Sequence, residues 1–286
     1  MFKNHGEARV QCHFLSTIIC SLPSLVLFSE KSTLVIEGLG TALYRNEFLR
    51  IFFRKIFCFF SFRRVFMNSF ERKELGKPSD LVMNGIGINL PNKIPEFKAT
   101  SGNEEVIKIA YFGRLIKDKG VMDCFKVCDY LLDEGYDFSL DLYGSIYLQN
   151  PTSLTSDDID EIKKKYEGSV NFHGFTNDVM ERLNLIDLVV LPSRCEGFPV
   201  IVMEANSLGI PCFVYDVPGS RDSVIHGKTG FIADYANVNT MANQIIDYMK
   251  LSSGSKKKIF NYCIEISRDN YCRNDKDKLL SEVVLS

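Results

Sequence analysis

The sequence lacks tryptophan, has only four histidines among its 286 residues, and carries a net charge of −2. Because so small a net charge produces no global field, we expect no nucleic-acid partner. None of the nine cysteines is spaced as C-x-x-C, and no zinc-type spacing of two Cys and two His occurs, so we interpret them as free thiols in a reducing cytosol. Two D-x-D stretches, at 158–160 and 275–277, fall in polar helical segments, and we predict no metal site.

An apolar run long enough to cross a membrane is also absent. Residues 13–28 are largely apolar, but the run is shorter than the ~20 residues of a spanning helix, and Pro23 interrupts it. The charges ahead of it are mixed, and no small-residue cleavage site stands out before Glu30. We interpret the segment as a core helix and strand, in preference to a signal peptide or an anchor, and expect a cytoplasmic protein.

The composition changes along the chain. Residues 1–90 are rich in Phe, Leu, Ile and Arg, whereas residues 91–105 are polar, as an interdomain linker would be. We therefore predict two domains, 1–100 and 101–286, the second ending in a helical tail.

From residue 106 onward, short apolar runs alternate with amphipathic stretches. The predicted strands are 107–112, 138–143, 170–172, 188–191, 211–215 and 231–233, and the predicted helices are 120–133, 156–166, 177–184, 199–208, 220–225 and 238–250. This alternation predicts an α/β fold with a parallel sheet covered on both faces. Such sheets bind ligands beyond the carboxyl ends of their strands, so the loops there are where we expect the chemistry.

One strand–loop–helix segment, 191–204 (LPSRCEGFPVIVME), suits a nucleotide sugar. Gly197 permits close approach of the backbone to a ligand, and Pro199 fits the first turn of a helix. The free N–H groups and the dipole of that helix start attract an anion. Glu196 and Glu204 bracket the anion position, so they can accept hydrogen bonds from hydroxyls on both sides of a diphosphate. Two Glu at this spacing are common as solvated charges, but the strand–Gly–Pro–helix context favours the binding role.

A cationic segment follows the first strand of this domain. Gly113 is followed by Arg114 and Lys119. Arg offers phosphate oxygens a planar fork and Lys offers a compact charge. Both could reach the same diphosphate from the carboxyl end of the strand. The alternative is that Arg114 and Lys119 are exposed cations on a loop. We interpret Lys117 as such a solvated charge.

Two more loops follow predicted strands. Gly174 and Phe175 come after the third strand and resemble a loop that reads a nucleobase through its backbone, whereas we interpret His173 as structural. The segment YDVPGSRD repeats the strand–Gly–helix pattern, although its Arg221 and Asp222 could simply pair with each other.

Together these segments resemble the group 1, or family 4, retaining glycosyltransferases of the GT-B type. The matching pieces are FGRLIKDKG, NFHGFTNDV, LVVLPSRCEGFPVIVMEA, GIPCFVYDVPGSRDSVIHGKTGF and, more weakly, VIEGLGTAL. Within that family the chain looks most like bacterial enzymes that build lipid-linked O-antigen or capsule units. The resemblance implies two Rossmann-like domains facing each other across a cleft, with the donor in the C-terminal domain and the acceptor mainly in the N-terminal one.

The resemblance also implies roles for single residues. Arg114 and Lys119 would hold the donor diphosphate and, with Glu196 on the transferred sugar, form the catalytic set. Glu204 would bind the ribose of a nucleotide that is by preference UDP. The configuration at the anomeric carbon would be retained, because the acceptor would attack the face from which the leaving group departs. The reaction would need no metal or other cofactor. The implied donor-binding residues are Gly113, Gly174, Phe175, Gly197, Phe198, Pro199, Val200 and Glu204.

The chain departs from a complete member of the family near its N-terminus. Ahead of residue 33 nothing looks like the first strand and glycine-containing loop of a Rossmann-like domain, so we expect the first domain to be incomplete. Two hypotheses remain open: an active hexosyltransferase at the inner face of the cytoplasmic membrane with a lipid-linked glycan acceptor, or a catalytically impaired fragment that binds nucleotide sugar without transfer. Sugar-nucleotide epimerisation is a third, which the scarcity of histidine disfavours.

Residues 45–73 form a basic aromatic stretch. Eight cations and two carboxylates give it a local net charge of +6, and Phe and Ile are interleaved with them. It could be an interfacial helix attracted to anionic lipid, or a core helix with a solvated basic edge. Charges recur too often for a membrane-spanning helix.

Overall fold

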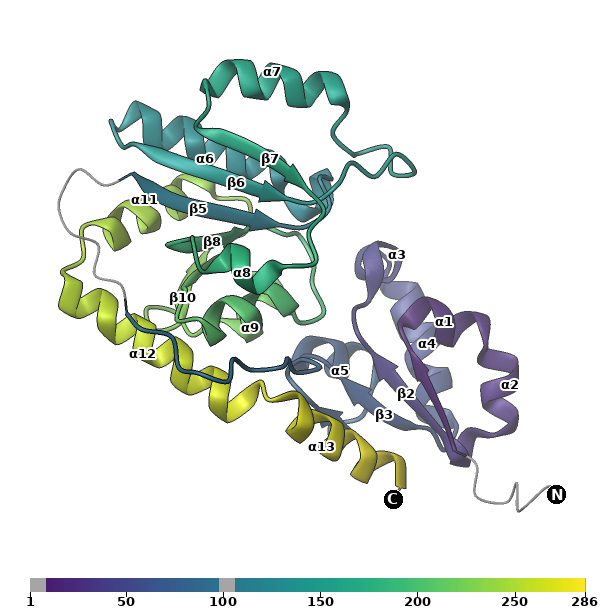
Figure 1. Ribbon diagram of the computed structural model, residues 1–286. Helices are drawn as coiled ribbons and strands as arrows, with labels where there is room; N and C mark the ends of the chain where they lie inside the picture. Colours follow the sequence, from purple (N-terminus) through teal and green to yellow (C-terminus); the bar gives the residue numbers. More distant parts are fainter. Residues whose placement is uncertain (1–8, 98–105, 286) are drawn as a thin grey trace.

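The structure, a computed structural model, describes residues 9–97 and 106–285. Its strands form two separate parallel sheets, one of four strands from the first part of the chain and one of six strands from the second. Figure 1 shows the two sheets in two lobes, each with helices packed against it. The predicted α/β fold with two parallel sheets is therefore confirmed.

The first sheet has the strand order β1-β2-β3-β4, and every neighbouring pair is parallel. Its core is a buried apolar cluster that includes Leu34 and Phe57. The apolar run at 13–28 folds mainly as two short helices that bury Ile18 and Leu25 in this cluster. Its contribution to the core is confirmed, but the expected strand is wrong, because a second helix, α2 (Leu22–Leu27), takes its place. The elements are β1 (Val10–His13), α1 (Leu15–Cys20), α2 (Leu22–Leu27), β2 (Ser32–Ile36), α3 (Gly40–Arg45), α4 (Glu47–Phe59), β3 (Arg63–Phe66), α5 (Ser69–Leu75) and β4 (Leu81–Val82).

Strand β1 lies ahead of residue 33, where the sequence analysis recognises no strand followed by a glycine-containing loop. Its residues, Val-Gln-Cys-His, lack an apolar pattern, and it is the parallel pairing with β2 that makes this segment a strand. No glycine follows it, since the chain enters α1 through Phe14.

The second sheet has the order β10-β9-β8-β5-β6-β7, again all parallel. Each predicted strand and helix after residue 106 is present, with boundaries that differ by at most two residues. The elements are β5 (Ile107–Phe112), α6 (Val121–Asp133), β6 (Phe138–Tyr143), α7 (Ser156–Tyr166), β7 (Val170–Gly174), α8 (Val179–Leu183), β8 (Leu188–Leu191), α9 (Val200–Ser207), β9 (Cys212–Tyr215), α10 (Ser220–Ser223), β10 (Gly230–Ala233), α11 (Val238–Met249), α12 (Ser253–Asn270) and α13 (Arg273–Leu285).

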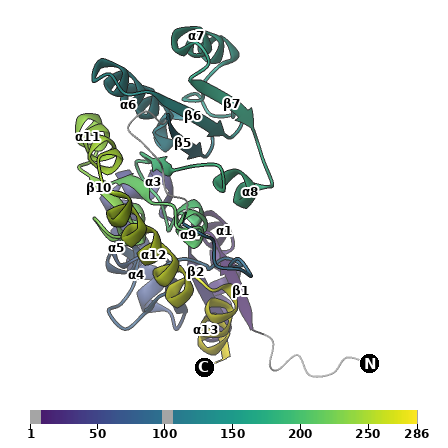
Figure 2. The same ribbon diagram turned by 60° about the vertical axis from the view of Figure 1, so that its left-hand side comes forward.

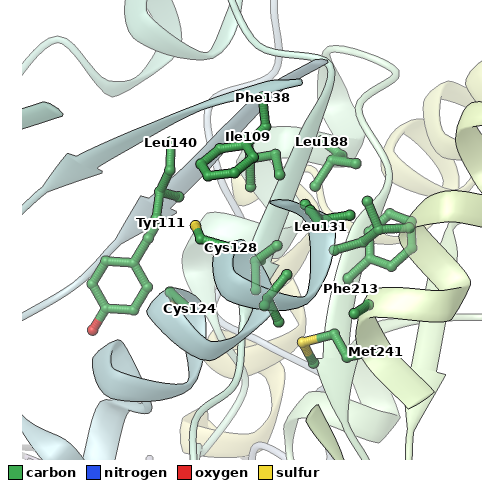
Figure 3. Close-up of a cluster of buried hydrophobic side chains, with 14 of the residues drawn as sticks. Ile109, Tyr111, Cys124, Cys128, Leu131, Phe138, Leu140, Leu188, Phe213 and Met241 are labelled. Carbon is green, nitrogen blue, oxygen red and sulfur yellow. The ribbon is translucent and has the colours of Figure 1, made fainter. Parts of the chain in front are cut away.

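The largest buried cluster fills the space between this sheet and helices α6 and α11 (Figure 3). Ile109, Leu188 and Phe213 come from three strands and meet Leu131 of α6 and Met241 of α11. All five side chains are at most 1% exposed, and burying each contributes about 1.5–3 kcal/mol. This core fixes the strands, and therefore the positions of the loops at their carboxyl ends.

The last two helices connect the lobes. Helix α12 packs on α9, while α13 contacts β2 and β3 of the first sheet, and Figures 1 and 2 show the pair running along both lobes. A buried cluster joins Val65 and Met83 of the first lobe to Phe198 and Met203 of the second, with Tyr271 at the helix junction. The helical tail thus contacts both lobes. The domain boundary predicted at 100/101 falls outside the described residues, so the domain ranges stay a prediction.

The remaining predictions concern cysteine, the D-x-D stretches and membrane spans. All nine cysteines are free, and five are buried. Asp158 forms the capping box of α7 with Thr155, and Asp275 lies in the first turn of α13. Within 9–97 and 106–285, no helix combines the length and the apolar character that crossing a membrane requires.

Candidate active site

A cavity lies where the order of the second sheet reverses. Strands β5 and β8 are neighbours, and from them the sheet grows in opposite directions, which is the usual ligand position in such sheets. The loops after these two strands flank a cavity of about 290 Å³. It is lined by Phe112, Gly113, Lys119, Val179, Leu191, Glu196, Pro199, Val200, Ile201 and Glu204. Six of the predicted site residues are therefore brought together: Gly113, Lys119, Glu196, Pro199, Val200 and Glu204.

Lys119 and Glu196 form an ion pair at this cavity. The Lys119 Nζ atom lies 2.7 Å from Oε1 and 2.8 Å from Oε2 of Glu196. The side chains are 24% and 14% exposed, so water screens the pair only in part. The adjacent Cys195 adds no charge, because burial raises the pKa of its thiol to about 11. The pair holds a cation and a carboxylate at the cavity wall.

The N-terminus of α9 faces the same cavity. Pro199 is the N-cap and offers no side-chain cap to the first-turn N–H groups, while Val200 and Ile201 line the cavity. Such uncapped N–H groups and the helix dipole favour an anion. Glu204, one turn further along α9, is half-buried, and desolvation raises the pKa of its carboxyl group. The cavity thus offers an anion position between two carboxylates.

Arg114 and Phe198 lie outside the cavity lining. Arg114 is exposed, and its guanidinium sits over the ring of Tyr147 at 5.2 Å. Phe198 is buried, with its ring 6.0 Å from that of Tyr271. The Phe198 side chain therefore packs the junction of the lobes, which leaves only its backbone for a ligand.

Gly174 and Phe175 also lie outside the lining. They stand at the end of β7, and Phe175 is 73% exposed. The neighbouring His173 has its Nε2 atom 2.8 Å from Asp141 and its ring stacked on Tyr143. These contacts agree with a structural role for His173, while the nucleobase role of the loop stays a prediction.

The first lobe meets the Glu196–Gly197 loop directly, which the sequence analysis missed. A Cβ atom on Gly197 would lie 2.6 Å from the carbonyl oxygen of Glu37, so only glycine allows this approach. The Asn68 side chain caps α5 by accepting from the Glu71 N–H, and its Nδ2 donates to the Gly197 carbonyl at 2.6 Å. The capping spacing Asn68-x-x-Glu71 was the available signal, but nothing in it pointed to Gly197.

Acidic groups of the first lobe gather near that loop. Glu37 follows β2, and its Oε1 lies 2.6 Å from His13 Nδ1 at the end of β1. Glu71 is buried, and desolvation raises the pKa of its carboxyl group to about 8, with smaller upward effects from Asp222 and Glu37. The carboxyl ends of the first sheet therefore face the loop that carries Glu196.

The YDVPGSRD segment packs against the other side of the same loop. A Cβ atom on Gly219 would lie 2.3 Å from the Glu196 carbonyl oxygen. Asp222 accepts from the Gly219 N–H at 2.9 Å and from the Ser69 hydroxyl at 3.2 Å. Arg221 pairs with Asp216 at 3.0 Å, so the Arg221–Asp222 pair considered from the sequence is wrong.

The basic aromatic stretch divides between core and surface. Helix α4 buries Phe53 and Phe57, but Phe48, Phe52 and Phe59 on its other face are 86%, 56% and 83% exposed. The helix belongs to the core on one face, and its exposed face is apolar as well as basic.

Within the described part of the chain, no group of three or more His, Cys, Asp or Glu side chains is arranged to hold a metal ion.

Comparison with known proteins adds sequence and structural relatives. The family described as Glycosyl transferases group 1 matches residues 92–265. The capsular polysaccharide biosynthesis glycosyltransferase CapM of Staphylococcus aureus is 28% identical over 154 residues, which are 54% of this chain and 39% of CapM. The N,N'-diacetylbacillosaminyl-diphospho-undecaprenol alpha-1,3-N-acetylgalactosaminyltransferase of Campylobacter jejuni is 26% identical over 173 residues, 57% of this chain and 43% of that protein. The chain spans less than half the length of these two relatives.

Among solved structures, Anabaena HepE in complex with UDP superposes with a TM-score of 0.77. The match covers 94% of this chain and 76% of HepE, at 15% sequence identity. At that identity the likeness concerns the fold, and it extends over both lobes.

Proposed function

Because this chain belongs to the group 1 glycosyltransferases, we propose that it is a hexosyltransferase that moves a sugar from a UDP-sugar to a growing lipid-linked surface polysaccharide, with retention of configuration. One observation carries the proposal: Lys119, Glu196 and Glu204 surround one cavity at the point where the sheet order reverses. The UDP named for HepE supports the donor class. CapM and the Campylobacter enzyme, by their names, support polysaccharide synthesis.

The cavity residues would divide the work on the donor. Lys119 and the first-turn N–H groups of α9 would hold the diphosphate, and Glu196 and Glu204 would accept hydrogen bonds from the sugar and the ribose. When the bond from the anomeric carbon to the diphosphate oxygen breaks, the acceptor hydroxyl bonds to the same face of that carbon and its proton leaves with the diphosphate. Fixed positive charge at the leaving oxygens stabilises that state most where water is excluded.

Arg114 would act as a second cation on the diphosphate only after leaving Tyr147. Its side chain is exposed and unconstrained apart from the contact with that ring, so a rotation would bring no buried group into water. Gly174 and Phe175 would contact the base from the end of β7, and the backbone of Gly197 and Phe198 would contact the sugar and the phosphate.

A lipid-linked acceptor places the reaction next to a membrane. The exposed face of α4, with Phe48, Phe52 and Phe59 alongside Arg54 and Lys55, has the composition of a helix that lies in an anionic lipid interface. We therefore assign peripheral membrane contact to residues 45–73, at the cytoplasmic face.

The proposal is tested by incubating the chain with a panel of UDP-sugars and polyprenyl-diphosphate-linked sugars in the presence of membranes, and measuring the release of UDP. Release that needs the acceptor and is lost in Lys119→Gln supports transfer. Saturable UDP binding without release in any combination would contradict transfer and indicate a nucleotide-sugar-binding fragment.

A further inference from the structure

A second, larger cavity lies between the lobes, and we propose that it binds the diphosphate of a polyprenyl-diphosphate-linked acceptor. The inference rests on the proposed function and names the acceptor position for it. The cavity measures about 710 Å³, within the usual range of ligand sites. Arg54 of α4 and Arg72 and Lys73 of α5 line one side, and Arg221 of α10 lines the other. We call it the basic cavity.

The charge of the basic cavity suits a diphosphate. Its lining carries four cations, of which Arg221 is paired with Asp216 outside the lining. It also carries one carboxylate, that of Asp222, which already accepts from Ser69 and Gly219. Within the described ranges, neither Arg54 nor Lys73 forms an ion pair or a hydrogen bond with another side chain. Unpaired cations around one cavity attract an anion with several negative oxygens, and Arg binds phosphate oxygens in pairs.

The eight cations of residues 45–73 support this assignment. Arg50 pairs with Glu74, Arg64 with Asp80, and Arg45 with Asp118 at 3.8 Å. Three of the other five, namely Arg54, Arg72 and Lys73, line the basic cavity. Three of the five cations of this stretch that form no ion pair within the described residues are thus gathered at one concave site.

The basic cavity lies beside the proposed donor site. Pro218 lines it, and the next residue, Gly219, packs against the carbonyl groups of Glu196 and Gly197. Glu196 lines the donor cavity, so the loop at 196–197 separates the two cavities. A sugar attached to a diphosphate in the basic cavity would therefore stand next to the loop that holds the donor sugar.

The surroundings of the basic cavity suit a lipid chain. The rings of Tyr44 and Phe70 form an apolar wall, with their centroids 6.1 Å apart. Arg54 lies on α4, whose exposed face carries Phe48 and Phe52. A polyprenyl chain that leaves the diphosphate along α4 would enter the lipid interface on that same face, whereas a free diphosphate would gain nothing from these apolar groups.

The test measures the binding of farnesyl diphosphate, inorganic pyrophosphate and UDP to the wild-type chain and to the double variant Arg54→Gln, Lys73→Gln. We expect the double variant to bind farnesyl diphosphate at least about tenfold more weakly, through loss of two charge-assisted contacts, with UDP affinity unchanged. Lys77→Gln is the matched control, because Lys77 is an exposed cation on the same surface that does not line the cavity.

Equal affinity of the wild type and the double variant for farnesyl diphosphate would overturn the inference, as would a parallel loss of UDP binding. Pyrophosphate that binds as tightly as farnesyl diphosphate would overturn the assignment to a lipid-linked ligand. Absence of UDP binding in the wild type would count against the proposed function alone, since the farnesyl diphosphate result would stand independently of it.

Discussion

The ammonium group of Lys119 touches both carboxylate oxygens of Glu196, at 2.7 and 2.8 Å, although the two residues are 77 positions apart. Each follows a central strand of the second sheet, Lys119 after β5 and Glu196 after β8. Under the proposed function, Lys119 would stabilise the charge of the leaving diphosphate and Glu196 would accept a hydrogen bond from a hydroxyl of the transferred sugar.

The first prediction separates the roles of this pair. Lys119→Gln should lower the rate of sugar transfer by about 10²–10³-fold, the usual effect of removing one stabiliser of a leaving-group charge. Glu196→Gln should also lower transfer but leave UDP affinity nearly unchanged, because UDP lacks the transferred sugar that Glu196 is proposed to bind. Steady-state kinetics and UDP titration of both variants check this, with Lys117→Gln as control, since Lys117 is exposed and lies outside the cavity lining. A Glu196→Gln variant with wild-type turnover would contradict the assigned role.

The second prediction concerns Glu204 and the ribose. The wild type should bind UDP about tenfold or more tightly than 2′,3′-dideoxy-UDP, because a hydrogen bond to a charged group contributes about 1.5–3 kcal/mol. Glu204→Gln should reduce this discrimination. Burial raises the pKa of Glu204, so its carboxylate should gain a proton at a higher pH than an exposed glutamate does. UDP affinity should therefore fall more steeply with decreasing pH in the wild type than in the variant. Equal discrimination in both proteins would place the ribose elsewhere.

The third prediction links Glu71 to the pH dependence of stability. Its pKa is raised by burial to about 8, from an ordinary value of 4.5. Between these values the folded chain holds a proton that the unfolded chain has lost, so the free energy of unfolding falls as pH rises, by up to about 1.4 kcal/mol per pH unit. This contribution is complete below pH 4.5 and lost above pH 8. The free energy of unfolding, measured with urea at several pH values, should fall less steeply with rising pH for Glu71→Gln than for the wild type.

Glu161→Gln is the control for that experiment, because Glu161 is an exposed carboxylate on α7. If the free energy of unfolding changed with pH equally in Glu71→Gln and in the wild type, Glu71 would be ionised in the folded chain.

The fourth prediction tests the bond between Asn68 and Gly197. Asn68→Ala removes both the cap of α5 and the donor to the Gly197 carbonyl, and should cost about 1–2 kcal/mol of stability. Asn68→Ser keeps a capping oxygen and loses the amide N–H that reaches the Gly197 carbonyl. If the bond holds the Glu196–Gly197 loop in place, the Ser variant should lose transfer activity while keeping most of its stability. Loss of stability without loss of activity would make Asn68 a helix cap only.

The fifth prediction concerns the exposed face of α4. The double variant Phe48→Ser, Phe52→Ser should bind vesicles that contain anionic lipid more weakly than the wild type, and added salt should weaken the wild type further. Both side chains are exposed, so the melting temperature should not change. Co-sedimentation with vesicles measures the effect, and Leu148→Ser, at a 90% exposed position on the other lobe, is the control. If all three proteins sedimented equally with the vesicles, the proposed membrane contact of this face would be contradicted.

The sequence allowed the second sheet to be predicted almost residue by residue, because its strands are short, mostly apolar runs such as Leu188–Leu191, and glycine or proline marks the end of several of them, as Gly113 does after β5 and Pro192 after β8. It also allowed Lys119, Glu196 and Glu204 to be grouped, since parallel strands bring their carboxyl-end loops to one edge. Arg114 could not be placed in the same way, because the choice between a phosphate and the Tyr147 ring depends on rotamers of an exposed side chain.

Contacts between the lobes were beyond sequence reasoning. Asn68 and Gly197 are 129 positions apart, and nothing periodic relates them. The basic cavity combines α4 and α5 of one lobe with α10 of the other, so the surplus of cations in 45–73 was visible but its concave arrangement was not.

The central claim is that the cavity between Lys119 and Glu204 is the donor site, and a crystal structure of this chain with UDP bound tests it most directly. We predict the diphosphate within hydrogen-bond distance of Lys119 Nζ and the first turn of α9, with the ribose hydroxyls on the Glu204 carboxylate. UDP bound in the basic cavity, or anywhere away from these groups, would contradict the account.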